Sequence, residues 1–341
     1  MQPEELDPSL ISGSGPFPER GVGSNEPYHV VVDEPSDQIS TGVPTMASPA
    51  WTPEDETIPT RLLVLGMAHR NGSIHAGELY SVIESCGVSV DQLRSQLRRL
   101  VSEQLFTRTG EGRDAVFHAT PAGTATLTST MQRHRLAYAQ DAAGRGWDRR
   151  WRLVAFAIPE ARRTDRDAFR DRLLQLGAAS IQNGLYVSPH RWEAEVTEAA
   201  QRLGIGEYAT MGTTDDLEVA GERDPRKLAA RLWPLEEIAE RYRAFTATYK
   251  DVPENLEAMR RRGERIREAD FLPGVLHIAI RFNECFDHDP LLPPELLPRP
   301  WPGREAREVL ARCRRLGVLA REDKSGPALF QVFDDVIALL P

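Results

Sequence analysis

The chain has 341 residues, of which 40% are hydrophobic, so it is long enough to form two or three domains with cores of their own. No run approaches the roughly 20 apolar residues needed to span a bilayer, and the start of the chain lacks the basic and then apolar order of a signal peptide. We therefore expect a cytoplasmic protein without a membrane partner. Its three cysteines lie far apart and form no CxxC pair, which favours neither a disulfide framework nor a zinc site.

The net charge of −9 is unevenly distributed along the chain. Residues 1–59 contain eleven acidic residues and one arginine, so they carry −10 and the remainder carries +1. Residues 60–150 contain twelve arginines and eight acidic residues, a local charge of +4, which is the sign required for contact with phosphate. The acidic total therefore does not exclude a nucleic acid as partner.

The first segment, residues 1–58, is rich in Pro, Gly, Ser and acidic residues. Such a composition cannot bury enough apolar surface to offset the entropy lost on ordering, so we expect a disordered acidic tail. Met46 lies shortly before the first expected helix and is, beside Met1, a candidate start of translation.

Three helical segments are predicted next, beginning with RLLVLGMAHR after Thr60 and continuing with residues 75–86. The third begins at Ser89, where Gln92 can reach back to close a capping box. The apolar residues of this third helix recur at helical spacing and form one stripe. They are Leu93, Leu97, Leu100 and Val101.

A hairpin is predicted after the third helix, with residues 105–109 and 115–119 as strands on either side of Glu111-Gly112-Arg113. Thr120 and Pro121 then favour the start of a long helix that ends near Gly144. Residues 59–145 therefore have the order of a winged helix-turn-helix domain with an exit helix.

The outer face of the third helix is a candidate DNA-reading surface. A helix in a major groove would present Arg94, Ser95 and Arg98 to base edges or phosphates, with Arg99 on the same polar face. Arg113 at the hairpin tip would reach a minor groove or a phosphate. An arginine-bearing face of an isolated helix is more often simply solvated, but the neighbouring helix and hairpin favour double-stranded DNA as partner.

Residues 146–222 are predicted to form a ferredoxin-like domain. The expected elements are a strand at 150–160, a helix at 164–176, two strands around Asn183-Gly184, a helix at 192–203 and a strand at 207–211. This β-α-β-β-α-β order is typical of the ferredoxin-like fold.

Residues 223–341 are predicted to form a mainly α-helical domain. The expected helices are 225–250, restarted near Trp233-Pro234, then 254–268, 272–286 and 304–316. The Pro-rich stretch 290–303 is expected to be an extended linker. The whole chain is therefore expected to belong to the α+β class.

Several segments follow one another in the order found in a known family. They are SVDQLRSQLRRLVSEQ, then Trp147-Asp148 with Trp151, IPEARRTDRDAFRDRLLQLGA, GLYVSPHRWE, LWPLEEIAERYRAF and DPLLPPELLPRPWPG. In these segments the chain resembles the PaaX-type repressors of phenylacetate and other aromatic catabolism. The hairpin GEGRDAVFHAT departs from the family, in which many members have a more basic, tyrosine-rich strand.

The resemblance implies a homodimeric transcriptional repressor that binds a palindromic operator. In the family an aryl-CoA thioester, phenylacetyl-CoA in the best-known branch, releases the repressor from DNA. We expect no enzymatic activity and no cofactor other than such an effector. The alternatives are a metal-dependent nuclease with a ferredoxin-like core and a DNA-binding protein that responds to no ligand.

Candidate effector contacts can be named. Arg261 and Arg265 belong to the densest basic run, and arginine suits acyl-CoA phosphates because it forms bidentate hydrogen bonds. Trp192 and Trp233 are candidates to line a pocket for the aromatic acyl group. The alternative interpretations are a solvated helix face, neutralised by nearby glutamates, and aromatic residues that belong to the core.

Five residues of metal-ligand type lie in one short stretch: His277, Cys285, Asp287, His288 and Asp289. Their convergence would need a bend that the sequence does not indicate, because the first two lie about two helical turns apart and Pro290 follows the last. The nuclease alternative needs an acidic residue on the strand WRLVAFAI, which has none, and only Glu160 follows it. We therefore predict neither a metal site nor a catalytic residue.

Overall fold

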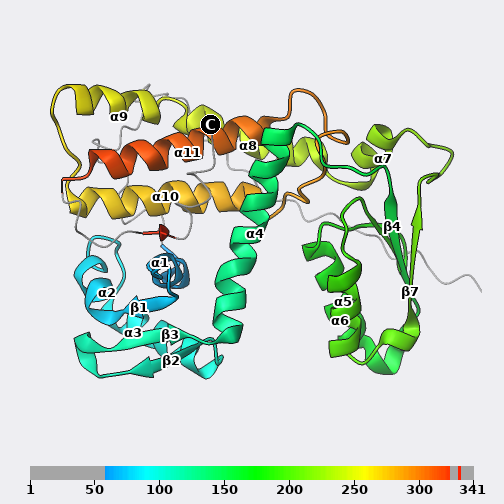
Figure 1. Ribbon diagram of the computed structural model, residues 1–341, viewed down its shortest axis with the longest axis horizontal. Helices are drawn as coiled ribbons and strands as arrows, with labels where there is room; N and C mark the ends of the chain where they lie inside the picture. The colour runs from blue at the N-terminus through cyan, green and yellow to red at the C-terminus, as the bar shows by residue number, and fades with distance from the viewer. Residues whose placement is uncertain (1–57, 323–328, 332–341) are drawn as a thin grey trace, which may run out of the picture. The chain divides into compact units, whose positions relative to one another are not determined.

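The computed structural model describes residues 58–322 and 329–331. The predicted acidic tail, with Met46, lies outside the described residues except for its last position. The described part is a mixed α+β structure in which the strands form two antiparallel sheets (Figure 1). None of its helices is both long and apolar enough to cross a membrane.

The first helices are α1 (Thr60–Gly66), α2 (Ala76–Val82) and α3 (Val90–Ser102). The predicted capping box of α3 is confirmed: the Gln92 backbone N–H donates to Ser89 Oγ at 3.2 Å, and the Ser89 backbone N–H donates to Gln92 Oε1 at 2.8 Å. These two bonds satisfy backbone donors that the first turn of a helix otherwise leaves without partners. The local sequence thus fixes where α3 begins.

A small sheet follows α3, with β2 (Phe106–Thr109) and β3 (Val116–Ala119) forming the predicted hairpin. Its tip is a short 3₁₀ turn at Gly112–Asp114. A third strand, β1 (Ser73–His75), pairs with β3 and gives the order β1-β3-β2. The sequence did not indicate β1, because three residues are too few to show an alternating pattern.

The exit helix α4 (Pro121–Ala143) begins and ends as predicted. Thr120 Oγ1 accepts a hydrogen bond from the backbone N–H of Gly123 at 3.1 Å. Gly144 follows the last turn with a φ of +62°, a conformation that glycine adopts without the steric cost of a side chain.

The central elements are β4 (Trp151–Phe156), α5 (Arg163–Gln175), β5 (Ala179–Gln182), β6 (Leu185–Ser188), α6 (Glu193–Arg202) and β7 (Ala209–Thr214). This is the predicted β-α-β-β-α-β order, and the strands lie in the order β5-β6-β4-β7, all antiparallel. Phe169 of α5 and Val196 of α6 pack with Val154 of β4 in one buried cluster. Both helices therefore cover the same face of the sheet.

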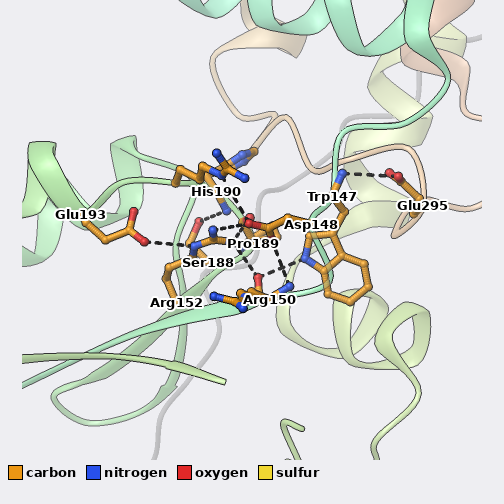
Figure 2. Close-up of polar contacts among 10 residues, drawn as sticks. Trp147, Asp148, Arg150, Arg152, Ser188, Pro189, His190, Glu193 and Glu295 are labelled. Atoms are coloured by element: carbon orange, nitrogen blue, oxygen red, sulfur yellow. Dashed lines mark hydrogen bonds and ion pairs between the residues drawn. The ribbon is translucent and has the colours of Figure 1, made fainter. Parts of the chain in front are cut away.

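A polar network holds the segment that enters β4 (Figure 2). Arg152 is buried and donates to Asp148 Oδ1 at 2.7 Å, to Glu193 Oε1 at 3.3 Å and to the Pro189 carbonyl at 3.2 Å. The Arg152 guanidinium holds the pKa of the Asp148 carboxyl well below its usual range. The backbone N–H of Trp147 donates to Glu295 Oε1 at 3.4 Å. The Trp147-Asp148 pair thus fixes how the chain enters the sheet.

The remaining helices are α7 (Pro225–Leu232), α8 (Leu235–Tyr249), α9 (Val252–Arg261), α10 (Glu268–Phe286) and α11 (Pro302–Ala320). Helices α8, α9 and α10 pack around α11 (Figure 1). The predicted restart near Trp233-Pro234 is confirmed by the break between α7 and α8.

The prediction of one helix over 254–268 was wrong. Helix α9 ends at Arg261, and Gly263 follows with a φ of +77°. The backbone N–H of Ile266 then donates to the Ala320 carbonyl at 2.9 Å, so this stretch bonds to the end of α11 and not to itself. The composition of the segment favours a helix, but Gly263 and the hydrogen bond to Ala320 of α11 favour the end of α9 at Arg261.

The predicted linker, residues 290–303, has no helix or strand before α11 begins at residue 302, but it also contributes to the core. Four leucines of this stretch are buried: Leu291, Leu292, Leu296 and Leu297. Three of them, Leu292, Leu296 and Leu297, share a core cluster with Trp151 of β4 and Trp233. The prolines prevent regular structure, but the apolar side chains between them still join the core.

A buried ion pair connects α4 to α11. The Arg307 guanidinium donates to both carboxyl oxygens of Asp141, at 2.6 and 2.8 Å, and the Arg307 side chain is only 5% exposed. A second carboxylate, that of Asp289, lies 3.9 Å from Arg307 and accepts a hydrogen bond from the Tyr242 hydroxyl at 2.8 Å. Arg307 therefore ties the end of α4 to the helices around α11.

Replacement of Ser89 by alanine should lower the free energy of unfolding by about 1 kcal/mol, because it removes the cap of α3. Urea denaturation of the full chain would measure the change. Ser95→Ala is the matched control, since Ser95 is exposed within the same helix and caps nothing. Equal losses of stability in the two variants would contradict the capping role.

Candidate nucleic-acid interface

The outer face of α3 is basic and exposed. Leu93, Leu97 and Leu100 are buried on its inner face. Since residues three and four apart lie on the same side of a helix, this leucine spacing determines which side faces outward. The exposed residues of the outer face include Arg94, Ser95, Arg98 and Arg99. The predicted residues of α3 therefore lie where a partner can reach them.

Tyr80 of α2 contacts two of the predicted basic residues. Arg94 Nε donates to the Tyr80 hydroxyl oxygen at 3.3 Å, which raises the pKa of Arg94. Arg113, in the turn between β2 and β3, has its guanidinium carbon 5.8 Å from the centre of the Tyr80 ring. This distance lies within the range of a cation–π interaction. One aromatic side chain thus holds an arginine of α3 and an arginine of the hairpin.

A cleft of about 530 Å³ lies between α3 and the hairpin. Arg94 and Arg98 line it from α3, and Arg108 lines it from β2. The apolar side chains of Leu97 and Phe117 lie in the same lining. Three guanidinium groups around one concave surface make it attractive to an anionic backbone.

Arg108 is a residue that the sequence reasoning missed. Its Nε donates to the Gly110 carbonyl at 3.1 Å, and Phe117 lies opposite it on β3. A signal was present, because alternate residues of a strand share a face and Arg108 follows Phe106 by two positions. Since Phe106 is buried, the alternation places Arg108 on the side of the sheet that bears the core.

The other predicted residues are placed differently. Arg99 forms an ion pair with Glu103 at 2.8 Å, and Arg61 of α1 contacts the same carboxylate at 2.8 Å. Hydrogen bonds from Arg61 and Arg99 lower the pKa of Glu103. The charge of Arg99 is thus partly balanced, and neither Arg99 nor Ser95 lines the cleft.

The four predicted effector residues are not brought together. Trp192 and Trp233 are buried in different core clusters, and Trp233 Nε1 donates to the Gly177 carbonyl at 3.2 Å. Arg261 and Arg265 are exposed, at the end of α9 and in the stretch that follows it. The two tryptophans are better explained as core residues, while the arginines remain a prediction.

The stretch of metal-ligand types and Glu160 have other contacts. Asp289 accepts the hydrogen bond from Tyr242, and its backbone carbonyl accepts one from Arg133 at 2.9 Å. Glu160 follows β4 and forms an ion pair with Arg166 at 2.7 Å. Within residues 58–322 and 329–331, no group of three His, Cys, Asp or Glu residues is placed to hold a metal ion.

Two protein-family models match parts of the chain. Residues 144–229 match the family model of the PaaX protein central Cas2-like domain, and residues 233–321 match that of the PaaX-like protein C-terminal domain. These matches place the chain among regulators of transcription. It belongs to the PaaX family.

The chain is also similar to two individual proteins. The chain is 25% identical over 247 residues to the transcriptional repressor PaaX of Escherichia coli (strain K12), an alignment that covers 71% of this chain and 74% of that protein. It also aligns with the structure of the uncharacterized protein Rv0674 from Mycobacterium tuberculosis at 21% identity and a TM-score of 0.47. That alignment covers 76% of this chain and 95% of the other.

Proposed function

We propose that the protein is a ligand-responsive repressor of the PaaX type, in which residues 59–145 act as a winged helix-turn-helix that binds operator DNA. The observation that carries this proposal is the cleft in which Arg94 and Arg98 of α3 meet Arg108 of β2. The order of α2, α3 and the β2–β3 hairpin supports it, because such domains place the second helix of the pair in the major groove.

In the proposed complex, α3 lies in the major groove of the operator. Arg94, Ser95 and Arg98 face base edges or phosphates, and Arg113 reaches from the hairpin to a minor groove or a phosphate. Arg108 contacts the sugar–phosphate backbone of the DNA strand that passes through the cleft. Arg99 contributes less to the attraction for DNA, because the carboxylate of Glu103 balances its charge. Local arginines, and not the net charge of the chain, attract the DNA.

The central elements are proposed to form a ferredoxin-like domain that, with the helical C-terminal part, forms a homodimer. Their order and antiparallel strand arrangement support this assignment. A dimer would present two copies of α3 about one turn of DNA apart, roughly 34 Å, to a palindromic operator. The proposed domain boundaries are 59–145, 146–222 and 223–341.

The proposed effector is an aryl-CoA thioester such as phenylacetyl-CoA, and the regulated genes encode the breakdown of aromatic or acyl-CoA compounds. Family membership supports this choice. Release from DNA requires that the effector bind more tightly to the form of the protein that does not fit the operator. By linkage, operator and effector then weaken each other's binding by the same factor.

Replacement of both Arg94 and Arg98 by alanine should abolish operator binding in a gel-shift assay. Each arginine that contacts a base contributes about 1–3 kcal/mol to the free energy of binding. Each arginine that contacts a phosphate changes the slope of the logarithm of the binding constant against the logarithm of the salt concentration by about one. The paired variant Arg243→Ala with Arg304→Ala is the control, since it removes the same charge from exposed positions on α8 and α11. Normal binding by the Arg94/Arg98 variant would refute the assignment of the reading face.

Footprinting on the DNA upstream of the protein's own gene would test the response to ligand. We expect a palindromic protected region that disappears when phenylacetyl-CoA is added, while free coenzyme A leaves it intact. Protection that persists with every aryl-CoA thioester would favour a DNA-binding protein without an effector. Cleavage of the DNA that requires a divalent metal would favour the nuclease alternative.

Tyr80 should position the two arginines that it contacts. Tyr80→Phe removes the hydroxyl that receives Arg94 but keeps the ring beside Arg113, whereas Tyr80→Leu removes both. Operator affinity should therefore fall in the order wild type, Phe variant, Leu variant. Thermal denaturation should show that both variants are folded. Wild-type affinity in the Leu variant, together with weak binding by Arg94→Ala, would exclude this positioning role.

A further inference from the structure

Helix α3 carries two valines that are exposed although they are apolar. Val90 is 41% exposed and Val101 is 37% exposed, whereas the three leucines of the same helix are buried. Within residues 58–120, which the structure describes throughout, these two valines are the large hydrophobic side chains that are exposed. Apolar residues scattered singly over a surface need no explanation, but here both lie on one helix.

The two valines lie on the side of α3 that faces the basic cleft. An α-helix has about 3.6 residues per turn, so Arg94 lies roughly 40° around the axis from Val90, and Val101 lies roughly 20° from it. Arg94 and Val101 both line the cleft. Val90 therefore belongs to the same flank, in the first turn of α3 and about 17 Å along the axis from Val101.

The side chain of Val90 has no evident role within the chain. The capping box at the start of α3 is formed by Ser89 and Gln92, and neither of its bonds involves the Val90 side chain. Valine is also a weaker helix former than alanine, because its branched Cβ restricts the side chain. An apolar, β-branched residue at this exposed position is better explained by a contact outside the chain.

The major groove of DNA offers one apolar group to such a side chain. Each base edge presents hydrogen-bond donors or acceptors, and thymine alone adds a 5-methyl group. In a helix-turn-helix complex the N-terminal residues of the second helix contact base edges, and Val90 is the first residue of α3. Arg94 follows one turn later on the same flank, so an apolar contact and a hydrogen-bond donor lie side by side.

We propose that Val90 contacts the 5-methyl group of a thymine in the operator and thereby contributes to the choice of DNA sequence. This inference rests on the proposed function, because it requires α3 to lie in the major groove. It adds a source of specificity to that function. Arginines that contact phosphates bind any sequence, whereas a methyl contact distinguishes thymine from the other three bases.

Uracil removes the proposed contact from the DNA side, because it lacks the 5-methyl group but pairs as thymine does. The probe is a duplex selected from random sequence for binding to the full chain, synthesised once with thymine and once with uracil in its place. The wild-type chain should bind the uracil duplex about fourfold more weakly, which corresponds to about 0.8 kcal/mol for one buried methyl group. Gel-shift titration measures both dissociation constants.

Replacements of Val90 remove the contact from the protein side. Val90→Ala should bind the thymine and uracil duplexes with equal affinity, because the contact is already lost. Val90→Thr keeps one methyl group and the branched shape, so it should retain part of the preference for thymine. Val318→Ala is the matched control, since Val318 is 40% exposed on α11 and its loss should leave the wild-type preference intact.

Thermal denaturation shows whether each variant is folded. Val90→Ser, which also lacks both methyl groups, replaces Val90→Ala if the alanine variant does not fold.

Equal affinity of the wild-type chain for the two duplexes would overturn the inference while the proposed function stands. An equal loss of affinity for uracil in the wild-type chain and in Val90→Ala would also overturn it, because another residue or the shape of the DNA would then account for the effect. If selection yields no duplex that binds more tightly than random DNA, the proposed function fails, and the role of Val90 fails with it.

Discussion

The bidentate ion pair between Arg307 and Asp141 is the interaction on which the arrangement of the chain most depends. It lies at the end of α4, the helix that leads from the β2–β3 hairpin toward β4. A buried charge that loses its partner is strongly unfavourable, so the pair disfavours any arrangement in which α4 leaves α11. Arg133 of α4 strengthens the attachment by donating to the carbonyls of Phe286 and Asp289.

The same helix links the hairpin to the C-terminal helices. Its first turn follows the hairpin that lines the basic cleft, and its later turns supply Tyr138 and Asp141 to the contacts with Arg307 of α11. Phe330 provides a second connection, because its backbone N–H donates to the Gly66 carbonyl of α1 and its own carbonyl accepts a hydrogen bond from Arg314 of α11. The elements that carry the basic cleft are therefore held to the C-terminal helices through both connections.

The basic face shows how local charge can oppose net charge. The chain is acidic as a whole, yet Arg94, Arg98 and Arg108 converge on one cleft. Arginines elsewhere, such as Arg99 and Arg307, are paired with carboxylates and contribute less to an external field. Attraction for an anionic partner therefore depends on which arginines face the same space and have few acidic neighbours.

The sequence by itself determined the capped starts of α3 and α4, the hairpins and the exposed face of α3. Their signals lie within a few residues of one another, as in Ser89 with Gln92 or in Asn183-Gly184. Only the tertiary structure decided the early end of α9, the burial of four leucines within 290–303 and the contacts of Tyr80. It also paired Arg307 with Asp141, separated by 166 positions. Such contacts depend on which distant surfaces meet, and no local pattern of spacing or polarity specifies that.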